Sequence, residues 1–283
     1  VGYERRKHMK VEETSFLNEY IAMADYGDRL GWHERNGGNF TYWMKPENVA
    51  DVKDELHDKG EWLPIGTNVD NLANEYFLIS GTGKYFHNMK KDSRHTIGII
   101  QVDSTGTKYR IRWGLENGGR PTSELPTHLM NMAVKAKLTN NENRVIYHCH
   151  CPNVIALTFL LPLKSEIITR EIWEMMTECP IIFPEGIVVV EWMVPGGREI
   201  AVVTSRLMET YNAVIWAHHG MFCSGVDFDS TFGLMHTIEK SAEMWIKVHS
   251  CRQDKLQTIP VEGFRDLQEA FQVTLDERFL YEK

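Results

Sequence analysis

The sequence predicts a single α/β domain in which helices cover both faces of a mixed, largely antiparallel central sheet. Short segments typical of strands follow one another like hairpins in the first half, which argues against a uniformly parallel sheet. Segments with apolar residues at helical spacing occur around them and through the second half. With 283 residues, the chain can bury a large core in one domain, residues 1–283.

The first predicted helix has Thr14 or Ser15 as its N-cap and ends at Gly31. Later helices are predicted over residues 122–138, from Pro152 on, over 169–176, 198–211 and 231–250, and from Val261 on. Strands are predicted over residues 40–44, 76–80, 97–102, 109–113, 145–149, 187–190 and 213–217. Residues 45–70 are polar with little periodicity, so we expect a loop-rich insertion between two strands.

Charge and composition narrow the classes of partner. Lys and Arg number 31 against 39 Asp and Glu, which gives a net charge of −8 without a basic run. A nucleic-acid surface is therefore not expected. An anionic substrate must be held by backbone amides, by a metal ion or by a few local cations.

The chain has no apolar run long enough for a membrane span and no visible signal peptide. Five scattered cysteines fit a reducing compartment better than a disulfide framework. We therefore expect a cytoplasmic protein without membrane contact. Residues 1–8 are interpreted as an extension that precedes a natural start near Met9.

The sharpest chemical signal is His148-Cys149-His150 at the end of a predicted strand. Side chains two positions apart on a strand point to the same face, so both imidazoles can reach one ion while Cys149 faces away. A second pair, His218-His219, precedes Gly220 at the end of another predicted strand. A three-histidine metal site with open positions is plausible, and spacing alone does not decide between His218 and His219.

Three further motifs have both a structural and a functional interpretation. Glu124, in Pro121-Thr122-Ser123-Glu124-Leu125-Pro126, can complement the first turn of a helix or act as a general base. Asn36-Gly37-Gly38-Asn39 and Gly81-Thr82-Gly83-Lys84 can be simple turns or can present N–H groups to a phosphate. Neither has the flanks of a nucleotide-binding motif.

Taken together and in this order, these motifs resemble those of the class II sugar-phosphate aldolases, and within them the members that act on L-rhamnulose 1-phosphate. The resemblance extends over residues 14–275 through Thr177-Glu178-Cys179, Trp192-Met193-Val194-Pro195-Gly196 and Thr231-Phe232-Gly233-Leu234. It implies reversible, zinc-dependent cleavage to dihydroxyacetone phosphate and L-lactaldehyde. It also implies one Zn²⁺ per subunit and a homotetramer with its active sites between subunits.

The resemblance also implies roles for individual residues. His148, His150 and His219 would hold the Zn²⁺, and Glu124 would be the catalytic acid and base. Glu178 would reach the site of a neighbouring subunit. The substrate phosphate would lie against these residues: Asn36, Gly37, Asn39, Thr82, Gly83, Thr122 and Ser123.

From the sequence alone, Glu178 can also be an ordinary solvent-exposed acid, because most Glu residues lie at the surface. It follows the predicted helix 169–176 and precedes Cys179-Pro180, so we expect no helix N-terminus for its carboxylate to complement. The alternative activities are L-fuculose-phosphate aldolase and pentulose-phosphate 4-epimerase, which share the metal ligands. A zinc hydrolase and a metal-stabilised binding protein with a closed site that includes Cys151 are alternatives from other classes.

Overall fold

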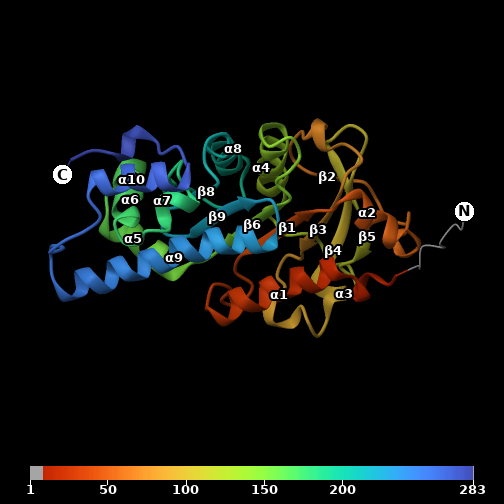
Figure 1. Ribbon diagram of the computed structural model, residues 1–283. Helices are drawn as coiled ribbons and strands as arrows, with labels where there is room; N and C mark the ends of the chain where they lie inside the picture. The colour runs from red at the N-terminus through yellow and green to blue at the C-terminus, as the bar shows by residue number, and fades with distance from the viewer. Residues whose placement is uncertain (1–8, 283) are drawn as a thin grey trace, which may run out of the picture.

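A mixed sheet runs through the centre of the molecule, as Figure 1 shows for the computed structural model, which describes residues 9–282. Its strand order in the described part is β2-β5-β4-β3-β1-β6-β9-β8-β7, and every neighbouring pair is antiparallel except β7 and β8. The largely antiparallel sheet is confirmed. The strands are β1 (Asn39–Trp43), β2 (Leu63–Pro64), β3 (Tyr76–Ser80), β4 (Ile97–Val102), β5 (Lys108–Gly114), β6 (Val145–Cys149), β7 (Val188–Val190), β8 (Ala213–Trp216) and β9 (Gly220–Gly225).

Helices cover both faces of this sheet, as predicted. In Figure 1, α4 and α8 lie side by side above it, and α1 and α9 lie below it. The helices α5, α6, α7 and α10 gather beyond its β7 end. Their bounds are α1 (Ser15–Arg29), α2 (Pro46–Asp51), α3 (Ser93–Thr96), α4 (Leu125–Leu138), α5 (Pro152–Leu160), α6 (Ser165–Trp173), α7 (Cys179–Ile182), α8 (Arg198–Leu207), α9 (Phe228–Cys251) and α10 (Val261–Phe271).

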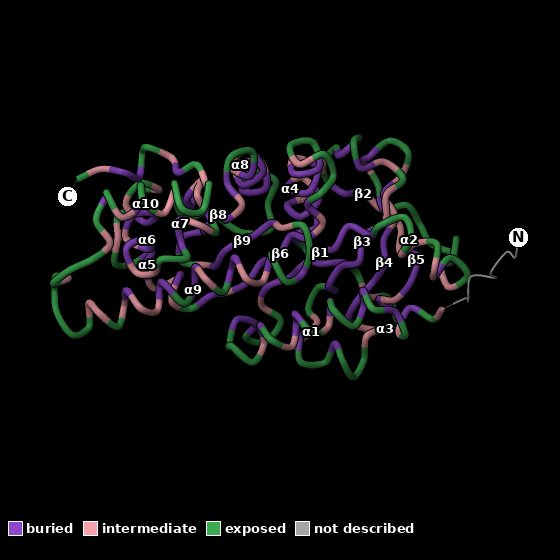
Figure 2. Tube along the Cα trace, in the orientation of Figure 1, coloured by how far each residue is buried: buried purple, intermediate pink, exposed green. Residues whose placement is uncertain are grey.

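Helix α1 anchors the central strand β1, which later contributes to the site. Thr14 is the N-cap of α1, and its side chain accepts a hydrogen bond from the backbone of Leu17. The ring of Tyr20 stacks on Phe40 of β1 with centroids 3.6 Å apart, and its hydroxyl donates to the carbonyl of Phe40. The central strands β1, β6 and β9 are buried almost throughout (Figure 2), so the site rests on a rigid base.

Several element boundaries differ from the sequence prediction. Helix α4 begins at Leu125 rather than at Thr122, because the Thr122 amide donates to the carbonyl of Ser80 and Pro121 bridges to Gly81. The helix predicted over residues 169–176 lies at Ser165–Trp173 instead. Strand β9 was not predicted, because two glycines bound it and only a short turn separates it from β8.

The remaining expectations fall on the chain's ends and on the polar segment. Residues 45–70 form α2, short turns and the edge strand β2, which pairs with β5. Residues 1–8, which were interpreted as an extension, lie outside the described residues. Among the described helices, none combines the length and the apolar character needed to cross a membrane.

Candidate active site

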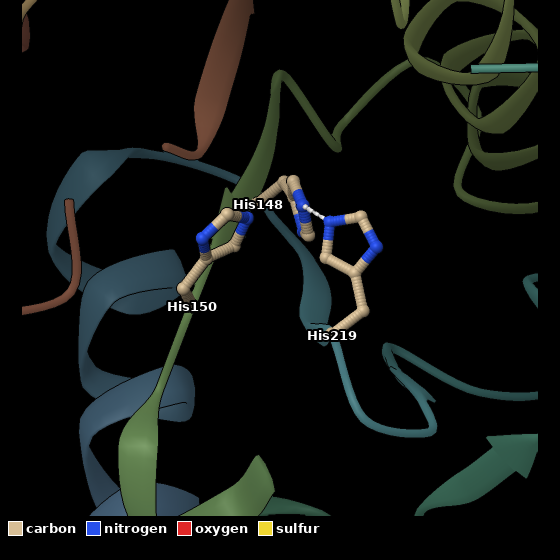
Figure 3. Close-up of side chains that lie close together, drawn as sticks. All are labelled: His148, His150 and His219. Carbon is tan, nitrogen blue, oxygen red and sulfur yellow. Dashed lines mark hydrogen bonds between the residues drawn. The ribbon is translucent and has the colours of Figure 1, made fainter. Parts of the chain in front are cut away.

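Two paired strands bring three histidines together. His148 lies in β6 and His150 directly after it, while His219 lies in the turn that joins β8 to β9. Strand β9 pairs antiparallel with β6, so the turn that carries His219 lies beside the end of β6. Figure 3 shows the three imidazoles facing one another from these two segments.

Gly220 makes this approach of the backbone possible. A Cβ atom at this position would lie 2.2 Å from the carbonyl oxygen of Cys149 and 3.1 Å from the ring of His148. Any larger residue would therefore push the β8–β9 turn away from β6. In the same turn, His218 has a φ of 59° and turns toward α5, where Thr158 Oγ1 lies 3.1 Å from its Nδ1. The turn thus directs His219, and not His218, toward the other two histidines.

The nitrogen atoms fit a single metal ion. Nδ1 of His148 lies 3.1 Å from the carbonyl of Met221, which leaves Nε2 to bind an ion. This Nε2 lies 3.3 Å from Nε2 of His219, and one nitrogen of each histidine lies within 4.8 Å of the other two. Two nitrogens bound at about 2.0–2.1 Å to one tetrahedral zinc would be about 3.3 Å apart. The spacing of the His148 and His219 nitrogens therefore matches that of two ligands of one metal ion.

Burial keeps the imidazoles of His148 and His219 neutral, as metal binding requires. It lowers the pKa of His148 well below its usual range, and the neighbouring His150 and His219 lower it further. Burial also lowers the pKa of His219 to about 4. His150 is more open, and its Nδ1 lies 2.6 Å from a carboxylate oxygen of Glu34, which leaves its Nε2 for a metal.

Glu124 lies beside this cluster, with Oε2 3.8 Å from Nε2 of His148. The residue precedes α4 at the N-cap position, but its side chain caps no backbone amide. Its Oε2 instead accepts a hydrogen bond from Nδ2 of Asn39 at 2.9 Å. Burial raises the pKa of Glu124, while the hydrogen bond from Asn39 and the nearby His150 act in the opposite direction. The helix-capping interpretation therefore has no contact to support it.

The histidines and Glu124 line one cavity of about 210 Å³ together with the predicted phosphate residues. Gly81 and Pro121 form a bridge that places the two hydroxyl-bearing loops side by side. No Lys or Arg among the described residues lines this cavity. The predicted residues that line it are Asn36, Gly37, Asn39, Thr82, Gly83, Thr122, Ser123, Glu124, His148, His150 and His219.

Glu178 is the one predicted site residue that does not line this cavity. It is exposed and lies at the N-cap of α7, and its carbonyl accepts hydrogen bonds from the Ile181 and Ile182 amides. The expectation that no helix begins after Glu178 was wrong. Helix α7 begins at Cys179, with Pro180 in its first turn, a position that proline fits well.

Sequence reasoning assigned no role to several residues near the site. Pro195 and Gly196 line the cavity from the segment before α8, and they lie in a motif that was singled out without a role. Glu34 directly precedes the glycine turn, and only its contact with His150 reveals it. His128 is buried one helical turn after Glu124, and no local pattern separates it from an ordinary core histidine.

Comparison with known proteins gives consistent matches. The family described as Class II Aldolase and Adducin N-terminal domain matches residues 18–246. The chain is 46% identical over 244 residues to a rhamnulose-1-phosphate aldolase of Mannheimia succiniciproducens, covering 86% of this chain and 89% of that protein. It is 43% identical over 264 residues to the rhamnulose-1-phosphate aldolase of Shigella boydii, covering 93% and 96%.

Solved structures share the fold. A sugar-phosphate aldolase from Thermotoga maritima aligns with a TM-score of 0.72 and 30% identity, covering 85% of this chain and 97% of that one. An L-fuculose 1-phosphate aldolase aligns with a TM-score of 0.60 over 94% of this chain and 99% of that one. Its identity of 18% supports the shared fold alone.

Proposed function

Because this chain belongs to the class II aldolases, a family of carbon–carbon lyases, we propose that it cleaves L-rhamnulose 1-phosphate reversibly to dihydroxyacetone phosphate and L-lactaldehyde. The substrate is the one that its relatives at 43% and 46% identity are named for. The main observation behind the proposal is one cavity that brings together three histidines, a buried carboxylate and two loops suited to a phosphate. The reaction belongs to rhamnose degradation in the cytoplasm, and the five unpaired cysteines support that compartment.

His148, His150 and His219 hold one Zn²⁺ per subunit in this proposal. Three neutral imidazoles leave the full double charge of the ion in place and leave positions open for substrate oxygens. When bound, the zinc supplies the positive charge that stabilises the negative charge developing on two neighbouring substrate oxygens during cleavage.

Glu124 moves the proton at the reacting carbon. As the carbon–carbon bond breaks, the hydroxyl that becomes the aldehyde carbonyl releases its proton to water. The electron pair of the broken bond stays on a carbon of the phosphate-bearing fragment, and that carbon must then gain a proton. Oε2 of Glu124 is engaged by Asn39, whereas Oε1 has no hydrogen-bond partner among the described residues, and the residue lines the same cavity as His148. Burial favours the protonated carboxyl group. Oε1 of Glu124 is therefore suited to donate this proton, and to accept it in the reverse direction.

The substrate phosphate lies against Asn36, Gly37, Asn39, Thr82, Gly83, Thr122 and Ser123. The amides of Gly38, Gly83 and Ser123 have no acceptor within the described chain, so three N–H donors are available at the cavity. The hydroxyls of the two threonines and Ser123 add to them. Since no cation lines this cavity in the described residues, amides and hydroxyls hold the phosphate and fix its distance from Glu124.

Glu178 acts in the site of a neighbouring subunit of a homotetramer. Two exposed apolar residues, Trp192 at 62% and Val194 at 70%, lie just before the cavity residue Pro195. Large apolar residues exposed beside a site are typical of a subunit interface. In a mixing experiment, Glu178→Ala and Glu124→Gln should each be nearly inactive alone. Hybrid tetramers should regain some activity, because one interface then combines two intact halves. If hybrid tetramers recover no activity, Glu178 does not act in the site of a neighbouring subunit.

Product analysis tests the proposed reaction. Purified protein with zinc should release dihydroxyacetone phosphate from L-rhamnulose 1-phosphate at least tenfold faster than from L-fuculose 1-phosphate, a preference of about 1.4 kcal/mol. It should leave a pentulose 5-phosphate unchanged. A higher rate with L-fuculose 1-phosphate, or epimerised pentulose phosphate, would indicate the related activity instead. Release of inorganic phosphate would indicate a zinc hydrolase.

A further inference from the structure

A chain of hydrogen bonds leads from the core of the domain to Glu124. Thr41 Oγ1 lies 3.0 Å from Nδ1 of His128, and Nε2 of His128 contacts Oδ1 of Asn39. Nδ2 of Asn39 then donates to Oε2 of Glu124 at 2.9 Å. All four side chains are buried, His128 and Thr41 completely. The three contacts link these four side chains in series.

Only one placement of the protons satisfies the whole chain. Oε2 of Glu124 accepts a hydrogen bond both in the ionised carboxylate and when the proton is on Oε1, so the NH₂ group of Asn39 must face Glu124 and its carbonyl oxygen must face His128. Nε2 of His128 must then carry the proton, and Nδ1 must accept from the hydroxyl of Thr41. His128 can keep this single proton because burial lowers its pKa to about 3. If the Asn39 amide rotated by half a turn, its carbonyl oxygen would face the carboxylate oxygen of Glu124, and the hydrogen bond between the two residues would be lost.

The fold fixes the position of His128 from several sides. Asn39 and Thr41 are two positions apart on β1 and therefore point to the same face. Glu124 and His128 lie one helical turn apart at the start of α4, facing that strand. The imidazole also packs edge-on against Phe222 of β9, with centroids 5.5 Å apart. A strand, a helix and an aromatic ring thus hold one imidazole.

We propose that His128 is a positioning residue for the aldol reaction: it holds the amide of Asn39 in the orientation that keeps the Glu124 carboxylate beside His148. It touches neither substrate nor metal and acts through Asn39. The kinetic part of this inference rests on the proposed function, and the structural part does not.

A matched pair of variants separates the hydrogen bond from the packing. His128→Gln keeps an N–H donor near the position of Nε2, whereas His128→Leu fills similar space without a donor. We expect His128→Leu to lower kcat for dihydroxyacetone phosphate formation at least about tenfold, as a displaced catalytic group does. KM should change less than about twofold, zinc content should stay the same, and His128→Gln should recover most of kcat.

A double-mutant cycle tests whether His128 acts through Asn39. In an Asn39→Ala background the amide is absent, so His128→Leu should cause no further loss in kcat. If the two losses in kcat multiply instead, His128 contributes only to packing and the proposal is wrong. Should His128→Leu not fold, Thr41→Val replaces it in the same cycle, because it removes the hydroxyl that fixes the tautomer of His128.

Crystal structures of the two variants test the proposal independently of any activity assay. The Glu124 carboxylate should leave its position beside His148 in His128→Leu and keep it in His128→Gln. A carboxylate in the wild-type position in both variants would overturn the proposal. If the wild type forms no dihydroxyacetone phosphate, the proposed function fails, and the crystal structures still decide whether His128 positions Glu124.

Discussion

Nε2 of His148 and Nε2 of His219 lie 3.3 Å apart, although 71 positions separate them in the chain. Both rings are shielded from water sufficiently for burial to lower their pKa values. Two neutral imidazoles whose lone pairs point into one space are a suitable pair of ligands for a divalent ion. The distance of 3.3 Å follows from the pairing of β6 with β9, so the sheet itself sets the geometry of the candidate metal site.

Replacing His219 tests the ligand set. We expect His219→Ala to lose stoichiometric zinc, because it removes one of three protein ligands. His218→Ala is the matched control and should keep zinc, because His218 faces Thr158 and Phe159 instead. Metal analysis after dialysis measures both variants. Zinc lost from His218→Ala but kept by His219→Ala would contradict the assignment.

Replacing Glu124 tests its role in proton transfer. Glu124→Gln is nearly isosteric, so it should keep the fold and the zinc. It cannot carry the transferred proton, so kcat should fall by about 10²–10⁴-fold. Steady-state kinetics with metal analysis of the same sample checks this. A loss below about threefold would leave Glu124 as a structural acid at the start of α4.

Glu34 is expected to strengthen zinc binding through His150. Its carboxylate oxygen lies 2.6 Å from Nδ1 of His150, and such partners of ligating histidines typically contribute 10–100-fold to metal affinity. Glu34→Ala should therefore weaken zinc binding by about 10–100-fold in a competition titration with a chelating dye. Glu47→Gln, an exposed change on α2, is the control. Equal Kd values for Glu34→Ala and the control would show that Glu34 does not support the metal.

Local patterns in the sequence predicted the parts of the site that depend on one segment. The spacing of His148 and His150 on a strand predicted a shared face, and Figure 3 shows it. The choice between His218 and His219 depends on the turn before β9, a strand that its flanking glycines concealed. The resemblance to known aldolases selected His219 where spacing did not.

Tertiary packing produced the features that the sequence could not predict. The contact of His128 with Asn39 requires α4 to lie against β1, and no spacing within either segment indicates it. At Glu178 the error came from a local signal. Pro180 was interpreted as the end of one helix, but it lies in the first turn of the next. The alternating and apolar strand patterns predicted most of the sheet, whereas the order of its strands emerges only from the structure.

The buried His128 should make the folded protein sensitive to mild acid. Its pKa of about 3 in the folded state lies below the value of about 6.5 for an unfolded histidine. The unfolded state therefore binds a proton that the folded state does not, and stability falls as pH falls below about 6.5. Between pH 7 and 5 this lowers the free energy of unfolding by about 2 kcal/mol.

The variant His128→Gln lacks this titration. Urea unfolding at fixed protein and zinc concentrations should show the wild type losing about 2 kcal/mol more than His128→Gln between pH 7 and 5. If the free energy of unfolding falls equally in the two proteins, His128 takes up a proton in the folded state. The assignment of a neutral, hydrogen-bonded imidazole would then be wrong.

Reconstitution with zinc tests the central claim most directly. Protein stripped by a chelator is titrated with Zn²⁺, and dihydroxyacetone phosphate formed from L-rhamnulose 1-phosphate is measured in a coupled assay at each point. We expect no measurable activity without metal and a linear rise that ends at one zinc per chain, in the wild type and not in His219→Ala. Full activity in the metal-free protein, or a rise that His219→Ala shares, would contradict a zinc-dependent aldolase built on these three histidines.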